Sequence, residues 1–445
     1  MHALYVTHRN VTRLITALGL VFSGGAFSAN LSDLYRDAFA YDAQYASARA
    51  SYRAVLEKLP QARAGLLPNI SADAYLRRND VESTLPGGDA RFTSDGMSAS
   101  ASQPLFRRQN WVQYEQAKLQ LKVGESQLKL AQQELILRVA RAYFDVLQAQ
   151  DNIAFIQSQK AAISEQLASA KRNFEVGNAT VTDTHEAQAR FDLTTAQEIA
   201  AQNEREIRLR ALQRLVGKSP MPLATLGDKT QLKLPKPTGI DEWVTRASEQ
   251  NLQTQIQRDL KLIADREVAR NRAGGYPTLD AVASYSVSNN QNFGSVQVDT
   301  HTAVVGLELA VPIYQGGLLG SRVREAVANQ DKARFDLENA HREAGLQASE
   351  AYLNVANGEA QVKALEQARI STQAQLDSTK LGLQVGVRTS LDVLNAQQQV
   401  LSAQRDLAEA RYNFILAGLN LQAAVGELDA ADLAEVDGYL GTVRE

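Results

Sequence analysis

The stretch Val176-Gly177-Asn178-Ala179-Thr180-Val181-Thr182-Asp183 has a counterpart further along the chain, Val385-Gly386-Val387-Arg388-Thr389-Ser390-Leu391-Asp392. The two stretches keep one offset, since 386 − 177 = 209 and 392 − 183 = 209. The same offset relates Gly217 to Gly426. A period of this length indicates two copies of one supersecondary unit rather than a short solenoid repeat.

Each of these stretches separates two long helical tracts. All ten prolines lie outside residues 105–219 and 313–445, and a proline inside a helix costs about 3 kcal/mol. The glycines suit left-handed C-caps, and Asp183 with Glu186, or Thr389 with Asp392, suits the start of the next helix. Each half is therefore expected to contain an antiparallel helical hairpin with a tight tip, near residue 177 and near residue 386.

Ahead of each helical tract the apolar residues recur with a period of two, which is the period of a strand. The expected strands cover residues 69–79, 94–106, 278–288 and 300–314, and their length suits a tilted membrane strand. An ordinary soluble hairpin with one buried face fits the same alternation. The sequence alone leaves both possibilities open.

The first 29 residues are typical of a secretory signal. Arg9 and Arg13 precede the apolar run 14–22, and small residues follow up to Ala29. The apolar run is too short to span a bilayer. Cleavage is expected after Ala26, Ser28 or Ala29, and the alternative is an N-terminal anchor that stays attached.

Composition excludes several classes of function. The net charge is −3, with 47 basic and 50 acidic residues, so no basic field is available for nucleic acid. The chain has no cysteine, so neither a disulfide nor an acylated thiol is expected. No later segment has about 20 consecutive apolar residues, and a membrane-bound form would have to use strands.

The expected organisation has four parts. They are a signal peptide (1–29), a first repeat (30–217), an irregular proline-rich connector (218–239) and a second repeat (240–445). Each repeat carries one strand pair and one helical hairpin. Four strands cannot close a membrane barrel, because the smallest single-chain barrels have about eight and an open edge in lipid leaves backbone groups unpaired. Other copies must supply the rest.

The two tip sequences, followed by Ala410-Arg411-Tyr412-Asn413-Phe414 and Ala424-Val425-Gly426, resemble the two halves of TolC-type outer membrane efflux and secretion channels. The resemblance covers essentially the whole chain after the signal. It implies a mixed, mainly α fold: a homotrimer with a 12-stranded transmembrane β-barrel, four strands per chain, continuous with a long periplasmic α-helical barrel. It places the protein in the outer membrane, with a large periplasmic portion.

The resemblance also implies export of proteins or small toxic molecules after a periplasmic adaptor and an inner-membrane transporter dock. Because the family's lipoprotein branch needs an acylated cysteine, the chain is expected in the branch that serves type I secretion. The alternative is a soluble periplasmic coiled-coil adaptor of an export complex. An adaptor should lack the duplicated strand pairs.

The gate of the tunnel is expected at Asp183, Arg388 and Asp392. Asp183 and Arg388 match family positions that form an ion pair between tip helices, and three copies of Asp392 would form an acidic ring. Asn395 stands where the family has a second acid, which predicts a less cation-selective entrance. Leu383 replaces a family tyrosine, so one hydrogen bond of the lock is missing. The alternative is that both acids only cap helices, worth roughly 1 kcal/mol each.

Adaptor docking is expected at the tips, on Val176, Gly177, Val385, Gly386 and Thr389. A purely structural role as turn glycines and packing valines is compatible with docking. No enzymatic activity, cofactor or metal is expected. The five histidines show no ligand spacing, and Gly316-Gly317-Leu318-Leu319-Gly320 lacks the spacing of a nucleotide-binding loop.

Overall fold

The computed structural model describes residues 29–82, 90–177, 180–219, 222–227, 235–292 and 296–441. The expected signal peptide lies outside the described residues except for Ala29. Asn178 and Ala179 of the first tip and residues 220–221 and 228–234 of the connector also lie outside them.

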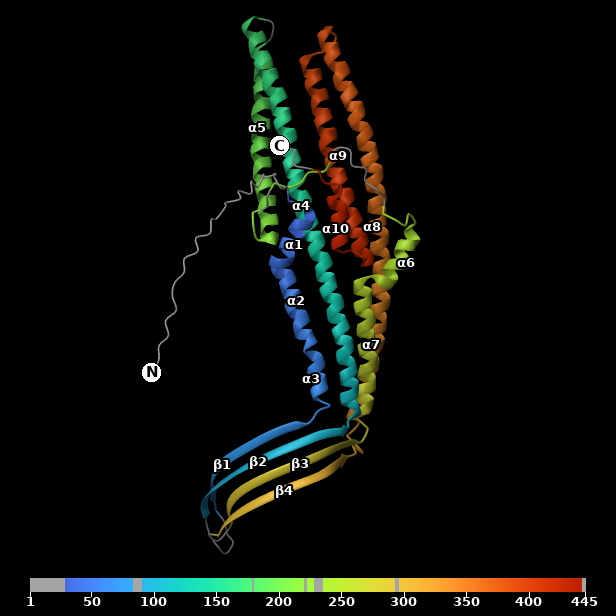
Figure 1. Cartoon of the computed structure of the whole chain (residues 1–445). Coiled ribbons are helices and arrows are strands. Elements are labelled where there is room, and N and C mark those ends of the chain that lie inside the picture. Colours follow the sequence, from blue (N-terminus) through green and yellow to red (C-terminus); the bar gives the residue numbers. More distant parts are fainter. Residues whose placement is uncertain are drawn as a thin grey trace, which may run out of the picture.

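Helices dominate the chain, and one sheet lies at one end of them (Figure 1). The first half contains α1 (Leu31–Tyr41), α2 (Ala43–Leu56), α3 (Lys58–Ala64), β1 (Asn69–Val81), β2 (Ala90–Phe106), α4 (Arg108–Glu175) and α5 (Val181–Val216). The second half contains α6 (Ile240–Gln250), α7 (Leu252–Ala273), β3 (Thr278–Asn292), β4 (Val296–Ala310), α8 (Leu318–Gln384), α9 (Ser390–Val425) and α10 (Ala430–Asp437).

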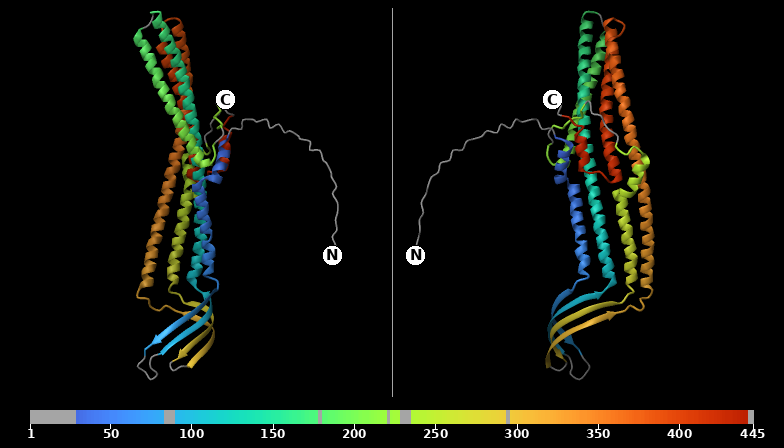
Figure 2. Two further views of the ribbon diagram at one scale, coloured as in Figure 1. Left: turned by 90° about the vertical axis from the view of Figure 1, so that its left-hand side faces the viewer. Right: turned by 45° about the vertical axis from the view of Figure 1, so that its right-hand side comes forward.

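Two very long helices connect the sheet to the tips. The helices α4 and α8 have 68 and 67 residues, which corresponds to about 100 Å each at 1.5 Å per residue. Helices α2 and α3 lie along the half of α4 nearest the sheet and α5 along the other half, and α7 and α9 accompany α8 in the same way (Figures 1 and 2). None of the described helices has an apolar stretch long enough to cross a membrane.

The shorter helices break at matching positions in the two halves, Asp42 and Asn251. Asp42 Oδ1 accepts the Tyr45 N–H at 2.7 Å and so caps α2, and the same carboxylate pairs with Arg138 at 2.9 Å. Asn251 Oδ1 accepts the Thr254 N–H at 3.1 Å and caps α7. These breaks were not predicted from the sequence, although the capping residues are 209 positions apart and short polar side chains favour caps.

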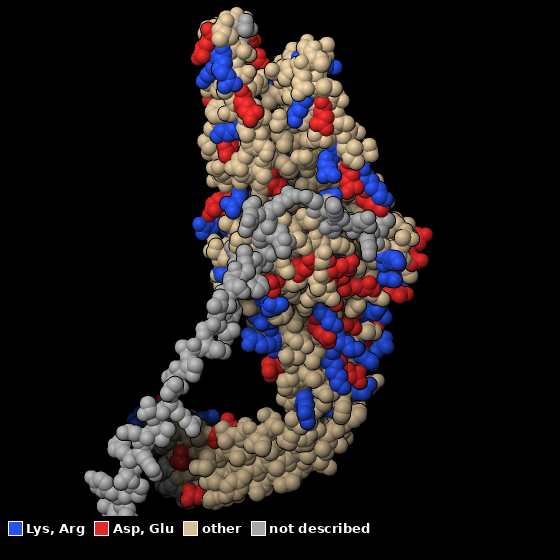
Figure 3. All heavy atoms as spheres, turned by 45° about the horizontal axis from the view of Figure 1, so that its top comes forward, with Lys and Arg blue, Asp and Glu red and all other residues tan. Residues whose placement is uncertain are grey.

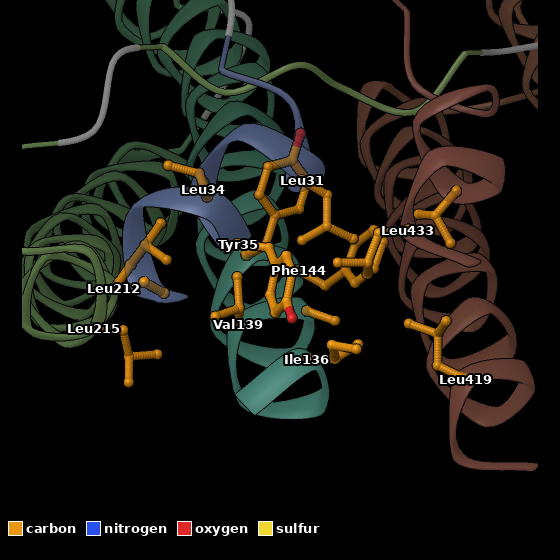
Figure 4. Close-up of a cluster of buried hydrophobic side chains, with 14 of the residues drawn as sticks. Leu31, Leu34, Tyr35, Ile136, Val139, Phe144, Leu212, Leu215, Leu419 and Leu433 are labelled. Atoms are coloured by element: carbon orange, nitrogen blue, oxygen red, sulfur yellow. The ribbon is translucent and has the colours of Figure 1, made fainter. Parts of the chain in front are cut away.

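A hydrophobic core joins the two halves midway along the helices. Figure 4 shows Leu31 and Leu34 of α1, Phe144 of α4, Leu419 of α9 and Leu433 of α10 meeting there. Next to this cluster the connector pairs with both ends of the described chain, at Ala29 with Leu223 and at Leu226 with Leu440. The Asp437 carboxylate also accepts the Leu31 and Ser32 N–H groups at 2.8 and 3.2 Å. The described connector stretch 222–227 is therefore part of the core region.

The four strands form one antiparallel sheet in the order β1-β2-β3-β4. Three strands are longer than expected near the connecting loops: β1 ends at Val81, β2 begins at Ala90 and β3 ends at Asn292. The strand β4 covers 296–310 instead of 300–314. The apolar alternation continues to Ile313, but Pro312 has no N–H to pair, and the expected end was four residues too late.

Candidate functional site

The register of the sheet separates its side chains into an apolar face and a polar face, because successive residues of a strand point to opposite sides. The apolar face holds Ile70, Ala72, Ala74, Leu76, Met97, Ala99, Ala101, Leu279, Ala281, Ala283, Tyr285, Val287, Ala303, Val305, Leu307 and Leu309, with Asp95, Gln103 and His301 among them. The polar face holds Ser71, Asp73, Tyr75, Ser98, Ser100, Ser102, Asp280, Ser284, Ser286, Ser288, Thr300, Thr302 and Glu308, with Val282, Val304 and Gly306 among them.

The apolar face is uncovered. Ile70 is 76% exposed and Val305 is 87% exposed, and no described helix packs on the sheet (Figure 1). Figure 3 shows the charged side chains gathered over the helices, with few on the visible face of the sheet. Exposing apolar surface to water costs roughly 25 cal/mol per Å², and patches of this extent mark contact with a membrane or a partner. The face is suited to lipid.

The polar face carries small hydroxyl groups and one strong ion pair. Ser71 Oγ and Ser100 Oγ are 2.8 Å apart. Arg107 donates from Nε to Asp280 Oδ1 at 2.9 Å and from Nη2 to Oδ2 at 2.6 Å. Two parallel bonds between a guanidinium and a carboxylate fix both groups. This pair joins the start of α4 to the third strand, and so fixes the sheet to the helices.

At the first tip, α4 ends in a left-handed glycine and α5 starts with a capping box. Gly177 has φ +80°, and its N–H donates to the Phe174 carbonyl at 3.0 Å. Thr180 Oγ1 accepts the Asp183 N–H at 3.3 Å, and Asp183 Oδ2 accepts the Thr180 N–H at 2.9 Å. The capping residue is therefore Thr180. The expectation that Asp183 caps the helix with Glu186 was wrong, because Asp183 is the third residue of α5 and the acidic partner in the box.

The second tip has the same construction. Gly386 has φ +81°, and the N–H groups of Val387 and Arg388 both donate to the Gly382 carbonyl, at 2.9 and 3.1 Å. Thr389 Oγ1 accepts the Asp392 N–H at 3.2 Å, and Asp392 Oδ2 accepts the Thr389 N–H at 2.8 Å. These bonds satisfy backbone groups that a helix end otherwise leaves free.

Within one chain Arg388 lies near Asp392, whereas Asp183 is on the other tip and, among the described residues, pairs with neither. Each acid is bound by the threonine of its own cap. The Arg388 side chain lies over Gly382, where an added Cβ would be 2.6 Å from Arg388 Cγ. Across the described part of the chain, no ion pair joins Arg388 to Asp183. An Asp183–Arg388 lock would have to form between copies or in another state of the tips.

The caps lower the pKa of both tip acids. Hydrogen bonds from the Thr180 backbone and side chain lower the pKa of Asp183, and those from Thr389 lower the pKa of Asp392, with a smaller contribution from the charge of Arg388. A lowered pKa means that the charged cap stabilises the folded tip above the ordinary value, and that this stabilisation disappears as the pH falls through the lower, folded value.

We therefore expect the tips to keep their caps at pH values down to the ordinary aspartate pKa of 3.8. The measurement is hydrogen exchange of the Thr180 and Thr389 amides against pH, corrected for intrinsic exchange. Protection should persist at the ordinary value and disappear below it. Loss of protection above that value would show that the charged Asp183 and Asp392 side chains do not stabilise the caps.

Comparison with known proteins gives the family. The family model described as Outer membrane efflux protein matches residues 34–218 and 247–427. The chain belongs to the outer membrane efflux protein family. It is 34% identical over 437 residues to the outer membrane protein TolC of Vibrio cholerae, covering 96% of this chain and 98% of that protein. It is 33% identical to the alkaline protease secretion protein AprF of Pseudomonas aeruginosa, covering 96% and 90%.

A solved structure shares the fold. The outer membrane channel CmeC of Campylobacter jejuni superposes with a TM-score of 0.77 at 17% identity, covering 98% of this chain and 97% of that one. This efflux protein is located in the outer membrane with its helices in the periplasm, as the sequence predicted. Its fold is the mainly helical channel fold expected from the resemblance.

The tips of this efflux protein expose more apolar side chains than the two valines predicted for docking. Val176 and Val385 are exposed, and Leu381 and Val387 are equally open, at 61% and 74%. The exposure of Leu381 and Val387 could have been predicted from the sequence, because apolar residues at a tight turn between two long helices have little to pack against. Elsewhere, the described residues contain no cluster of three or more potential metal ligands.

Replacing Gly386 by alanine should loosen the second tip of the efflux protein. A Cβ there has free space, but φ +81° disfavours any side chain, and the left-handed conformation costs roughly 1–2 kcal/mol. Hydrogen exchange of the Val387 and Arg388 amides should rise by roughly five- to thirtyfold, which is the factor that corresponds to this cost. The matched control is Gly418→Ala, which also has free space but lies inside α9 with no positive φ. Equal effects of both variants would contradict the cap.

Proposed function

We propose that three copies of this chain close into one barrel and form an export duct through the outer membrane. The observation that carries the proposal is the sheet: its apolar face is uncovered, and the outer edges of β1 and β4 have no strand partner among the described residues. An open edge in hydrocarbon leaves several backbone groups unpaired, each at a cost of several kcal/mol. Pairing β4 of one copy with β1 of the next would give twelve strands, four per copy.

In this assembly the polar face lines the passage and the apolar face contacts outer membrane lipid. The long helices continue the passage into the periplasm as a second, helical barrel. The protein has no chemistry of its own and acts as a conduit, not as an enzyme. No cofactor and no nucleic acid take part.

The cargo that we propose is protein, with small toxic molecules as a second class. Support comes from the relative AprF, which is named as an alkaline protease secretion protein. A transporter of the inner membrane and a periplasmic adaptor would supply the energy and the cargo, as in type I secretion. The alternative function predicted from the sequence, a soluble periplasmic adaptor, is not supported, because the chain belongs to an outer membrane family.

We assign adaptor docking to the tips, through Val176, Gly177, Val385, Gly386 and Thr389. The exposed valines offer apolar contacts, and the glycines with Thr389 hold the turns that present them. Leu381 and Val387 extend this surface. An adaptor tip with complementary apolar side chains would cover all of these residues.

We assign the gate to Asp183, Arg388 and Asp392. Arg388 of one copy would pair with Asp183 of a neighbour and hold the tips together, while three Asp392 carboxylates would form an acidic ring. Capping engages Oδ2 of each acid, and a carboxylate has further acceptor positions for an arginine. Because Asn395 stands in place of a second acid, the ring carries half the negative charge that two acids per chain would give, so the entrance should bind cations weakly.

The test is export in living cells. A strain that lacks its own channel, but contains a protease transporter and its adaptor, should release active protease when it expresses this chain. The same strain expressing Val176→Asp/Val385→Asp should retain the protease, although the channel still reaches the outer membrane. Retention of protease with the unmodified chain would contradict the proposed cargo.

A further inference from the structure

Tyr75 lies flat on the polar face of the sheet because its strand partner is a glycine. Tyr75 is directly opposite Gly96. A Cβ on Gly96 would be 2.8 Å from Tyr75 Cε1 and 2.9 Å from both Cζ and Oη. The ring therefore occupies the space where any other residue would have its side chain. Covering a strand glycine with a cross-strand aromatic ring is a known way to stabilise a sheet.

Arg77 stacks on this ring. Its guanidinium carbon is 4.7 Å from the centre of the Tyr75 ring, within the range of a cation–π contact. The two residues are two apart in β1 and so share the polar face. Arg77 has no ion-pair partner among the described residues. Asp73, on the same face, is four residues away, which is about 13 Å along a strand.

The position of this pair follows from the topology. Both residues lie in the part of β1 that runs away from the helices toward the β1–β2 connection (Figure 1). With the helices in the periplasm, that end of the sheet faces the exterior. The polar face nearer the helices carries serines together with the acids Asp73, Glu308 and the Arg107-paired Asp280, and Arg77 is a cation beyond them.

We propose that Arg77, held by Tyr75 over Gly96, forms an anion-binding ring at the outer mouth of the channel. The inference rests on the proposed threefold assembly, which brings three copies of Arg77 around one passage. Its ligands are multivalent anions, including the carboxylate clusters of an acidic polypeptide leaving the channel. A guanidinium without a paired carboxylate attracts anions, and the attraction is stronger where the channel wall excludes part of the water.

The test is block of ion current by a trivalent anion, hexacyanoferrate(III), added on the loop side of channels in planar bilayers. Arg77→Gln should raise the half-blocking concentration by about tenfold. The matched control is Arg78→Gln, because Arg78 is the next residue and points to the opposite face of the sheet. Equal block in Arg77→Gln and the unmodified channel, or an equal loss in Arg78→Gln, would overturn the proposal.

A second pair of variants tests the role of the glycine. Gly96→Val should push Tyr75 and Arg77 into the passage and lower the conductance, and adding Tyr75→Ser should restore it. Gly306→Val is the control, since Gly306 is also on the polar face but has nothing within 4 Å of an added Cβ. Equal conductance in the two valine variants would contradict the packing argument. An unmodified chain that passes no current would overturn the proposed channel itself, whereas normal current with unchanged block would overturn only the anion ring.

Discussion

Val305→Lys is expected to prevent stable insertion of the protein into the outer membrane, whereas Val304→Lys should be tolerated. The two residues are neighbours in β4 but point to opposite faces: Val305 pairs with Ala283 on the apolar face, and Val304 pairs with Ser284 on the polar face. A lysine that faces lipid near the middle of the bilayer costs roughly 2–4 kcal/mol in each chain, and a threefold assembly would multiply that cost. A lysine that faces a watery passage has little such cost.

The measurement is the amount of protein recovered with the outer membrane after cell fractionation, together with its resistance to extraction by urea. We expect little Val305→Lys protein in that fraction and near-normal amounts of Val304→Lys. Both substitutions place the same charge in the same strand, so a general effect on strand formation would affect both. Equal recovery of the two variants, or loss of Val304→Lys alone, would contradict the assignment of the faces.

The second large effect is expected at the gate. Asp183→Ala or Arg388→Ala should raise the single-channel conductance in planar bilayers, because each removes one partner of the proposed pair between copies. An exposed ion pair contributes up to about 1 kcal/mol, so three such pairs could shift the balance between closed and open tips by up to roughly a hundredfold. The increase in conductance should be largest under conditions in which the tips of the unmodified channel are almost always closed.

A capping effect has to be separated from loss of the lock. Asp183→Asn keeps an oxygen that can accept the Thr180 N–H but removes the charge, so it should also raise the conductance if the pair with Arg388 holds the gate. Glu186→Ala is the matched control, because Glu186 is an exposed acid one turn further along α5 that pairs with Arg190 at 2.9 Å on its own helix. Unchanged conductance in Asp183→Ala, Asp183→Asn and Arg388→Ala would reduce these residues to helix caps and structural partners.

The sequence was most informative where the chain repeats a pattern of known period. Proline-free tracts and left-handed glycines predicted the long helices and their breaks, since each glycine is followed by a threonine cap and an acid. Alternation predicted the strands, because one face had to be apolar. The strand ends near the connecting loops were predicted poorly. There Arg78, Asp80 and Arg91 occupy positions on the otherwise apolar face, so the sequence no longer alternates between apolar and polar residues.

Long-range contacts could not be predicted from the sequence. Nothing in the local pattern indicates that Asp437 caps α1 from more than 400 residues away, or that the connector pairs with Ala29 and Leu440. The sequence left two interpretations of Asp183 and Asp392 open, because a capping acid and a gate acid carry the same side chain. Within one chain both acids take part in capping boxes, and their role in a gate stays a proposal.

We propose that one chain is an incomplete channel wall. Native mass spectrometry of the protein, purified from outer membranes in mild detergent, tests this proposal. We expect a single species that contains three copies of the chain. A monodisperse single copy that remains dissolved after the detergent is removed would contradict it.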